Sequence, residues 1–278
     1  MSEPVALALA AHPDDIEFMM AGTLVLLGRA GYELHMVNLA SGCCGSMEEN
    51  RQATASRRLG EAREAARLLG ARLHDPIADD LELFYTKDLI ARVAAIVRAA
   101  RPTVILLPSP EDYMEDHMIA CRLGVSAAFV RGMPNFISNP SLAPIFHDVT
   151  LYHALPYGLR DGLRRVVIPG QYVNITPVLK EKRAALACHR SQKEWLDKTQ
   201  GLDSYLDTME AMSAEVGRWS GVFPHAEGWR RHSHLGFCAE NADPLSDALG
   251  EHVYTSVSYE KSLAEGVPDS PRKYDRRN

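Results

Sequence analysis

Three side chains that can bind a metal ion or move a proton lie within four residues of this sequence. His12, Asp14 and Asp15 directly follow the apolar residues 5–10, and Pro13 stiffens the backbone between them. An imidazole and a carboxylate are common zinc ligands, and a second carboxylate beside them can stay free as a base. The alternative is a polar turn in which Asp14 or Asp15 caps the next helix. The second aspartate and the preceding apolar segment favour a metal site.

A second polar cluster, residues 112–117, follows another apolar run at residues 103–107. A catalytic zinc ion needs about three protein ligands and an open position for water. His12, Asp15 and His117 could supply these ligands if the two clusters meet in the fold. An exposed histidine at the start of a helix is the alternative for His117.

The remaining carboxylates of the two clusters have separate predicted tasks. Asp14 would be the base that takes a proton from the metal-activated water. Asp116 could orient one of the metal ligands through a hydrogen bond. Zn²⁺ is therefore the expected cofactor, at one ion per chain, and other divalent metals are the alternatives.

The first half of the chain alternates between strand and helix patterns. Strands are predicted over residues 5–10, 34–40, 71–74, 103–107 and 148–153, and helices over residues 16–30, 52–69, 87–100 and 116–131. This alternation predicts an α/β, Rossmann-like, doubly wound fold, with a mostly parallel sheet and helices on both faces. In the common strand order, the winding reverses between the first and fourth strands, and ligands bind there outside the carboxyl ends. Both polar clusters follow these two strands.

The second half of the chain is less regular and predicts an irregular C-terminal α/β elaboration. Short strands are expected over residues 166–168 and 172–174, helices over 177–190 and 192–218, and an extended segment over 228–237. We expect one domain over residues 1–240, with its Rossmann-like core at about residues 1–155. Residues 241–278 are expected to form an extension that ends in a loose tail.

Composition limits the partners and the compartment. The net charge of −6 and the pI of about 6.0 argue against nucleic acid, because basic residues form only short clusters. Five cysteines without a CxxC pair indicate reduced thiols and a cytoplasmic protein. The apolar residues 5–11 are too few for a membrane span. We expect a small-molecule substrate and no membrane partner, and a homo-oligomer is left open.

The residues also resemble a known family, the PIG-L/LmbE-like zinc-dependent N-acetylglucosaminyl deacetylases. The matches lie after predicted strands and along one helix, at residues 11–15, 58–61, 65–66, 69–70, 79–81 and 116–117. Together they cover about residues 5–135, with weaker similarity near residues 225–237. The opening Ala-His-Pro-Asp-Asp with its strand is the most specific of them.

This resemblance implies hydrolysis of an N-acetyl or similar acyl group on a small amino-sugar-type substrate. It gives His12 and Asp15 as zinc ligands and Asp14 as the general base, and it implies that Arg58 and Asp80 bind the substrate. The alternatives are a metal hydrolase for another amide or ester, and a Rossmann-like module that only binds a small molecule or partner. No GxGxxG follows the first strand, and two acids there would repel a pyrophosphate.

The chain departs from the family pattern at one position. The family usually has HxxH after the fourth strand, where the first histidine polarises the acetyl carbonyl, but this chain has Met114 there. His232 and His234 are two residues apart in a predicted extended segment, so both side chains would lie on one face. We expect His234 to replace the missing catalytic donor and His232 to contact the substrate.

Overall fold

An eight-stranded mixed sheet forms the centre of the molecule. The computed structural model describes residues 3–193 and 205–264. The strands are β1 (Val5–Ala10), β2 (Glu33–Asn38), β3 (Arg72–His74), β4 (Val104–Leu107), β5 (Thr150–Ala154), β6 (Gln171–Asn174), β7 (Ala226–Arg231) and β8 (Val253–Thr255). Their order is β3-β2-β1-β4-β5-β7-β6-β8, and β1 to β5 are parallel to one another. The predicted doubly wound α/β fold is confirmed, with its reversal between β1 and β4.

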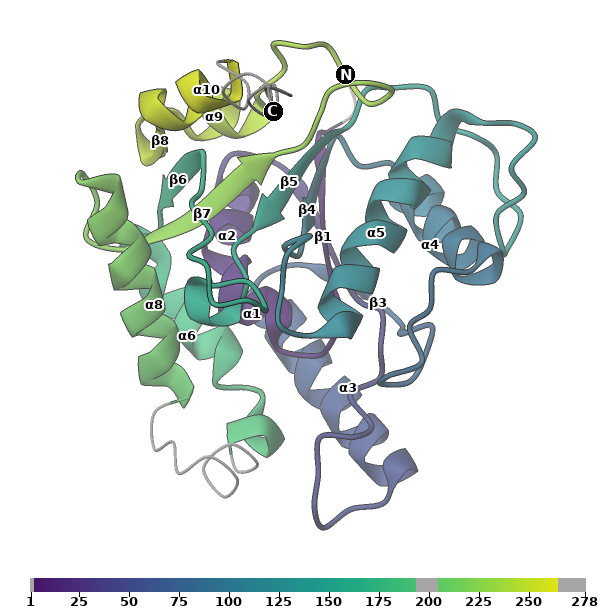
Figure 1. Ribbon diagram of the computed structural model, residues 1–278. Helices are drawn as coiled ribbons and strands as arrows, with labels where there is room; N and C mark the ends of the chain where they lie inside the picture. Colours follow the sequence, from purple (N-terminus) through teal and green to yellow (C-terminus); the bar gives the residue numbers. More distant parts are fainter. Residues whose placement is uncertain (1–2, 194–204, 265–278) are drawn as a thin grey trace, which may run out of the picture.

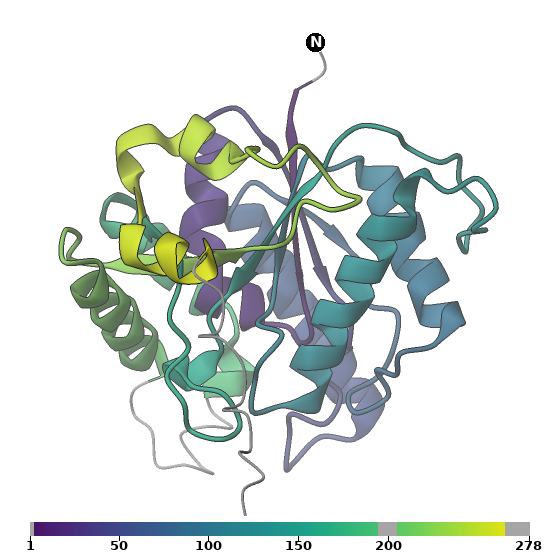
Figure 2. The same ribbon diagram turned by 45° about the horizontal axis from the view of Figure 1, so that its top comes forward.

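Helices cover both faces of this sheet (Figures 1 and 2). The α-helices are α1 (Asp15–Met19), α2 (Ala21–Arg29), α3 (Arg51–Leu68), α4 (Lys87–Ala100), α5 (Glu115–Phe129), α6 (Leu179–Leu186), α8 (Tyr205–Ser220), α9 (Pro244–Leu249) and α10 (Val257–Ala264). Short 3-10 turns are η1 (Val130–Gly132), η2 (Tyr157–Leu159), η3 (Thr176–Val178) and η4 (Gly250–His252). Within the described ranges, no helix has the length and apolar character that a membrane span requires.

Alternation along β1 divides the core into two layers. Ala6, Ala8 and Ala10 share one apolar cluster with residues of α2, α3, α6 and α9. Leu7 and Leu9 share the other cluster with residues of α4 and α5. Because side chains alternate between the faces of a strand, a strand covered on both faces is apolar throughout. All six residues of β1 are therefore buried, and their continuous apolar run predicts the strand from the sequence.

The helix predicted over residues 16–30 is broken at Met20. The backbone of Met20 has φ −133° and ψ −17°, which ends α1 and starts α2 in a new direction. The new amino terminus is held from a distant strand, because the Glu227 carboxylate accepts hydrogen bonds from the amides of Gly22 and Thr23. A helix pattern in the local sequence carries no information about such a partner.

The second half differs from its prediction in several places. Residues 166–168 form no strand and contribute only an isolated bridge between Arg160 and Val166. The extended segment over residues 228–237 is a strand only as far as Arg231, where β7 ends. Of the helix predicted over 192–218, α8 covers the last part, and residues 194–204 lie outside the described residues.

The chain beyond residue 240 joins the sheet and the core. β8 pairs with β6, and Leu245 and Leu249 of α9 are buried in the same apolar cluster as β1. The loose tail is predicted over residues 268–278, which lie outside the described residues.

A buried ion pair ties the second half to α2. Lys182 Nζ of α6 lies 2.6 Å from Glu227 Oε1 of β7, and both side chains are almost fully buried. The same carboxylate accepts the hydrogen bonds from the amino terminus of α2 at 2.7–2.8 Å. Glu227 therefore satisfies one buried cation and two backbone donors at once.

We predict that Glu227→Leu destabilises the protein by about 3–5 kcal/mol, because Lys182 keeps a buried charge without its partner. Urea unfolding of the variant and the wild type measures the difference in the free energy of unfolding. The matched control is Glu215→Leu, which removes an exposed ion pair with Arg218 on α8 and has a much smaller effect. Equal losses in the two variants would contradict this role for Glu227.

Candidate metal centre and active site

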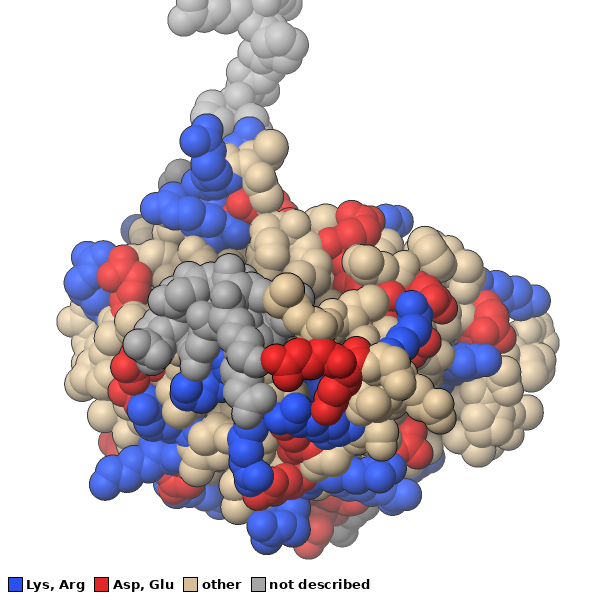
Figure 3. Space-filling view, turned by 90° about the horizontal axis from the view of Figure 1, so that it is seen from below, with Lys and Arg blue, Asp and Glu red and all other residues tan. Residues whose placement is uncertain are grey.

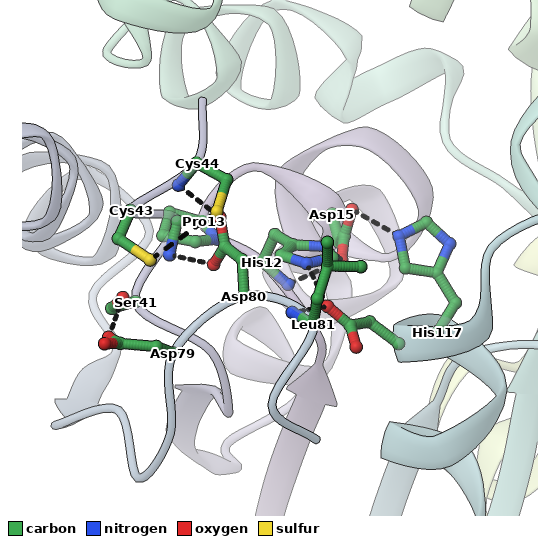
Figure 4. Close-up of polar contacts among 12 residues, drawn as sticks. His12, Pro13, Asp15, Ser41, Cys43, Cys44, Asp79, Asp80, Leu81 and His117 are labelled. Carbon is green, nitrogen blue, oxygen red and sulfur yellow. Dashed lines mark hydrogen bonds and ion pairs between the residues drawn. The ribbon is translucent and has the colours of Figure 1, made fainter. Parts of the chain in front are cut away.

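Three potential metal ligands meet where β1 and β4 end (Figure 4). His12 Nδ1 lies 3.6 Å from Asp15 Oδ2, and His117 Nε2 lies 3.4 Å from Asp15 Oδ1. Ligand atoms of all three residues lie within 4.8 Å of one another. Two ligands on one tetrahedral zinc ion are about 3.4 Å apart, since each is about 2.1 Å from the metal. The spacing and chemistry of His12, Asp15 and His117 therefore fit a divalent ion such as zinc.

A carboxylate behind His12 fixes the orientation of its ring. His12 Nε2 lies 3.0 Å from Asp116 Oδ2, so its other nitrogen, Nδ1, faces Asp15. The same Asp116 oxygen accepts a hydrogen bond of 2.8 Å from the amide of Leu81. Asp116 thus contacts one potential ligand and is not itself a member of the cluster of three. Such partners select the tautomer of a metal-binding histidine.

His117 has an equivalent partner that sequence reasoning did not assign. Its Nδ1 lies 3.0 Å from Asp112 Oδ1, which also accepts a hydrogen bond from the amide of Met114. The other nitrogen, Nε2, faces Asp15. Asp112 lies in the loop between β4 and α5, five residues before His117, and this short spacing is the signal that could have identified it.

Asp14 lies beside the three ligands but points to other partners. Its Oδ2 accepts a hydrogen bond of 2.7 Å from the Tyr205 hydroxyl, and its Oδ1 lies 3.5 Å from Arg58 Nη2. The backbone of Asp14 has φ 109°, a left-handed conformation that is strained for a residue with a side chain. Tyr205 belongs to α8 and was not singled out in the sequence.

Burial and charge change the pKa values in this site. Burial raises the pKa of Asp14, against the lowering effect of the Arg58 charge. Burial would lower the pKa of His12, but hydrogen bonds to Asp116 and Asp15 raise it to about 9. His117 is also buried, yet the charge of Asp15 and the hydrogen bond to Asp112 raise its pKa to about 11. The surrounding carboxylates therefore attract positive charge, either as protons or as a metal ion.

These groups line one cavity of about 360 Å³. The predicted site residues that line it are His12, Asp14, Asp15, Arg58, Asp80, Asp116 and His117. Met114 lines it as well, beside the apolar and aromatic side chains of Phe18, Tyr113, Tyr157 and Tyr205. A concave, largely apolar cavity with a few convergent polar groups is typical of a small-molecule site.

Arg58 and Asp80 hold the walls of the cavity. Arg58 is buried and donates hydrogen bonds to the carbonyl oxygens of Pro13 and Gly42, so it joins the turn after β1 to the loop after β2. Asp80 accepts hydrogen bonds from the amides of Gly42 at 2.6 Å and Cys44 at 2.8 Å. Their predicted contact with the substrate stays a prediction, because these hydrogen bonds already account for their placement.

His232 and His234 lie outside this cavity. β7 runs antiparallel to β5, so its carboxyl end points toward the opposite edge of the sheet. The amide of His232 donates to the carbonyl of Leu151, and its ring Nδ1 lies 2.9 Å from His153 Nε2. We therefore no longer place His232 or His234 at the reacting group, because the direction of β7 carries them away from it.

The face at which the parallel strands end is seen in Figure 3. Acidic and basic side chains are interspersed over the part of this face that is not covered by grey residues.

Comparison with known proteins supports the family assignment. The family model for GlcNAc-PI de-N-acetylases (PIG-L) matches residues 7–129. This range includes the three potential metal ligands. It also includes Asp14, Arg58 and Asp80. Residues 7–129 therefore match the PIG-L domain, and the resemblance predicted from the residues is confirmed.

Two curated relatives extend this similarity beyond the matched range. Diacetylchitobiose deacetylase of Thermococcus kodakarensis is 29% identical over 193 residues, which cover 67% of this chain and 69% of the relative. A 4-oxalmesaconate hydratase of Pseudomonas putida is 28% identical over 200 residues, covering 68% and 74% of the two chains. Relatives of this chain thus include a hydratase as well as a deacetylase.

A solved structure shares the fold. The N,N'-diacetylchitobiose deacetylase from Pyrococcus horikoshii superimposes with a TM-score of 0.69 at 24% identity. The similarity covers 88% of this chain and 89% of the other. The arrangement of the sheet and its helices is therefore shared over most of both proteins.

We predict that zinc binding at pH 7 releases up to about two protons per ion, because metal-binding imidazoles must be neutral. The pKa values of about 9 for His12 and 11 for His117 mean that both rings are protonated at this pH without a cation. Calorimetry in buffers of different ionisation enthalpy measures this release, and the zinc affinity falls as the pH is lowered. His12→Ala loses zinc binding and His252→Ala keeps it. Zinc binding without proton uptake by any buffer would argue against these ligands.

Proposed function

We propose that this protein is a zinc-dependent hydrolase that removes an N-acetyl or similar acyl group from a small amino-sugar-type substrate. The observation that carries this proposal is Asp14, a partly buried carboxylate outside the ligand set yet in the same cavity as His12, Asp15 and His117. A ligand set with a separate base beside it is the arrangement that metal-assisted hydrolysis needs. The PIG-L domain and the similarity to a diacetylchitobiose deacetylase support the substrate class.

The residues of the cavity divide the work of hydrolysis. A zinc ion held by His12, Asp15 and His117 would polarise the acyl carbonyl and lower the pKa of a bound water. Asp14 takes a proton from the attacking water and passes it to the leaving amine. The burial that raises the pKa of Asp14 makes it a better proton acceptor, and Tyr205 holds the carboxylate in place.

The carbonyl oxygen gains negative charge during amide hydrolysis and needs a donor. Met114 cannot donate, so we propose that the Tyr113 hydroxyl takes this part. Tyr113 lines the cavity, and its ring packs edge-on against His117 with 5.7 Å between the ring centroids. Burial raises the pKa of Tyr113, so its hydroxyl stays protonated and can donate. The Tyr205 hydroxyl is already used by Asp14.

A second candidate function is the metal-dependent addition of water to a carbon–carbon double bond. The similarity to a 4-oxalmesaconate hydratase supports it, as does Met114 at the position where the deacetylase pattern has a histidine. A hydration reaction does not cleave an amide and so releases no acetate.

Acetate release from a panel of N-acetyl amino sugars tests the two functions. Hydrolase activity is expected with at least one N-acetylated sugar, to disappear with a chelator and to return with zinc. The parallel assay measures the hydration of unsaturated dicarboxylic acids as a loss of their ultraviolet absorbance. Hydration without acetate release would favour the second candidate, and activity that survives the chelator would overturn the metal dependence.

We predict that Asp14→Asn lowers turnover by about 10²–10⁴-fold, the usual contribution of a general base. The variant keeps its zinc, because Asp14 is not one of the three ligands, and elemental analysis checks this. Asp247→Asn, at an exposed position on α9, is the matched control and keeps normal turnover. Near-normal turnover of the Asp14 variant would place the base elsewhere.

We predict that Tyr113→Phe lowers kcat by about 10²-fold, at the lower end of the loss for one donor to a developing oxyanion. KM and zinc content change little, because the hydroxyl acts mainly in the transition state. Tyr254→Phe on β8, outside the cavity, serves as the control. An unchanged kcat in the Tyr113 variant would mean that the metal alone stabilises the oxygen.

Three properties of the whole chain stay predictions. These are the single domain, to which β8 and α9 add residues beyond 240, the cytoplasmic location and the self-association that the sequence left open. Size-exclusion chromatography with light scattering measures the last of them.

A further inference from the structure

Two neighbouring cysteines and a carboxylate form a second cluster beside the cavity (Figure 4). The Sγ atoms of Cys43 and Cys44 are 3.9 Å apart. Ligand atoms of Cys43, Cys44 and Asp80 all lie within 4.8 Å of one another. The family resemblance gives no role to either cysteine, and the proposed hydrolysis does not use them.

We propose that Cys43, Cys44 and Asp80 form a second metal site, which takes a thiophilic divalent cation such as zinc or cadmium. Two thiolates on one tetrahedral zinc ion are about 3.8 Å apart, since each is about 2.3 Å from the metal. The observed 3.9 Å between the sulfur atoms matches this spacing. A disulfide would require the same atoms to approach to about 2.05 Å.

Asp80 is oriented for this task by the backbone. Each of its oxygens accepts one hydrogen bond, from the amides of Gly42 and Cys44 respectively. A carboxylate oxygen has two lone pairs, so each oxygen keeps one for a cation. The cation can therefore bind without breaking the hydrogen bonds that hold Asp80.

The loop conformation depends on Gly42. Gly42 has φ +75°, and a Cβ at this position would lie 2.7 Å from the side chain of Arg58. The turn places the Cys43 thiol inside the protein and leaves Cys44 exposed. A cation can reach the buried sulfur through the exposed one, which lines the cavity.

The donor atoms distinguish this cluster from the first one. His12, Asp15 and His117 offer two nitrogens and a carboxylate, whereas this cluster offers two sulfurs and a carboxylate. Thiolates favour softer cations than carboxylates and imidazoles do. Cadmium is therefore a selective probe for the cysteine cluster.

The two clusters are connected through a short chain of contacts. Asp80 is followed by Leu81, whose amide donates to Asp116, and Asp116 orients His12. A cation on Asp80 and Cys44 would also occupy the wall of the cavity. We therefore expect excess zinc at the second site to lower turnover, a consequence that rests on the proposed hydrolase function.

Cadmium titration of the reduced full-length protein tests the site directly, through the ultraviolet charge-transfer band of cadmium bound to thiolate. The wild type is expected to show this band, and Cys44→Ser is expected to lose it. Cys238→Ser, at a partly buried cysteine outside the cluster, is the matched control and keeps the band. His12→Ala also keeps it, because His12 belongs to the other cluster.

A wild type without the band, or a band that persists in Cys44→Ser, would overturn the second site. Thermal unfolding without metal checks that Cys44→Ser is folded, and Cys43→Ser provides a second variant with the same expected loss. The functional consequence is measured as inhibition by excess zinc, relative to the rate of each protein without it. Wild type is inhibited and Cys44→Ser resists inhibition. Because the band needs no turnover, a failure of the hydrolase proposal leaves the cadmium result interpretable.

Discussion

The reversal of winding between β1 and β4 is the constraint on which the candidate site depends. Parallel neighbours end at the same edge of a sheet, and here the chain leaves the two strands toward opposite faces. The turn that carries His12 and Asp15 therefore meets the helix start that carries His117. His12 and His117 are about one hundred residues apart in the sequence, so their contact depends on the fold and not on closeness along the chain. The sheet brings them together, and contacts such as that of Asp116 with His12 hold them there.

The aspartate carboxylates in this crevice have different partners. Asp15 faces both imidazoles, Asp112 and Asp116 lie behind them, and Asp14 is turned toward Tyr205. The backbone of Asp14 is in the left-handed region, and its carboxylate is hydrogen-bonded to the Tyr205 hydroxyl. Such crowding of negative charge is costly unless a cation, protons or hydrogen-bond donors compensate it. The same carboxylates raise the pKa values of His12 and His117, because they stabilise the positively charged imidazoles.

The walls of the cavity are joined by a few buried polar contacts. Arg58 links the turn after β1 to the loop after β2, and Asp80 holds that loop through two amides. From the second half of the chain, Glu227 fixes the amino terminus of α2, and Tyr205 reaches Asp14. The irregular half of the protein thus completes a site whose ligands all lie in the regular half. The loop that Asp80 holds also presents the two cysteines.

Local patterns predicted the order of strands and helices in the first half of the chain, the boundaries of β1 and α4, and the meeting of His12 with His117. These features follow from local periodicity and from a general rule on doubly wound sheets. Local patterns did not predict the break at Met20, the contact of Tyr205 with Asp14, or the direction of β7 that carries His234 away. Each of these depends on a partner distant in the chain, and a local pattern contains no record of which distant residue a segment will meet.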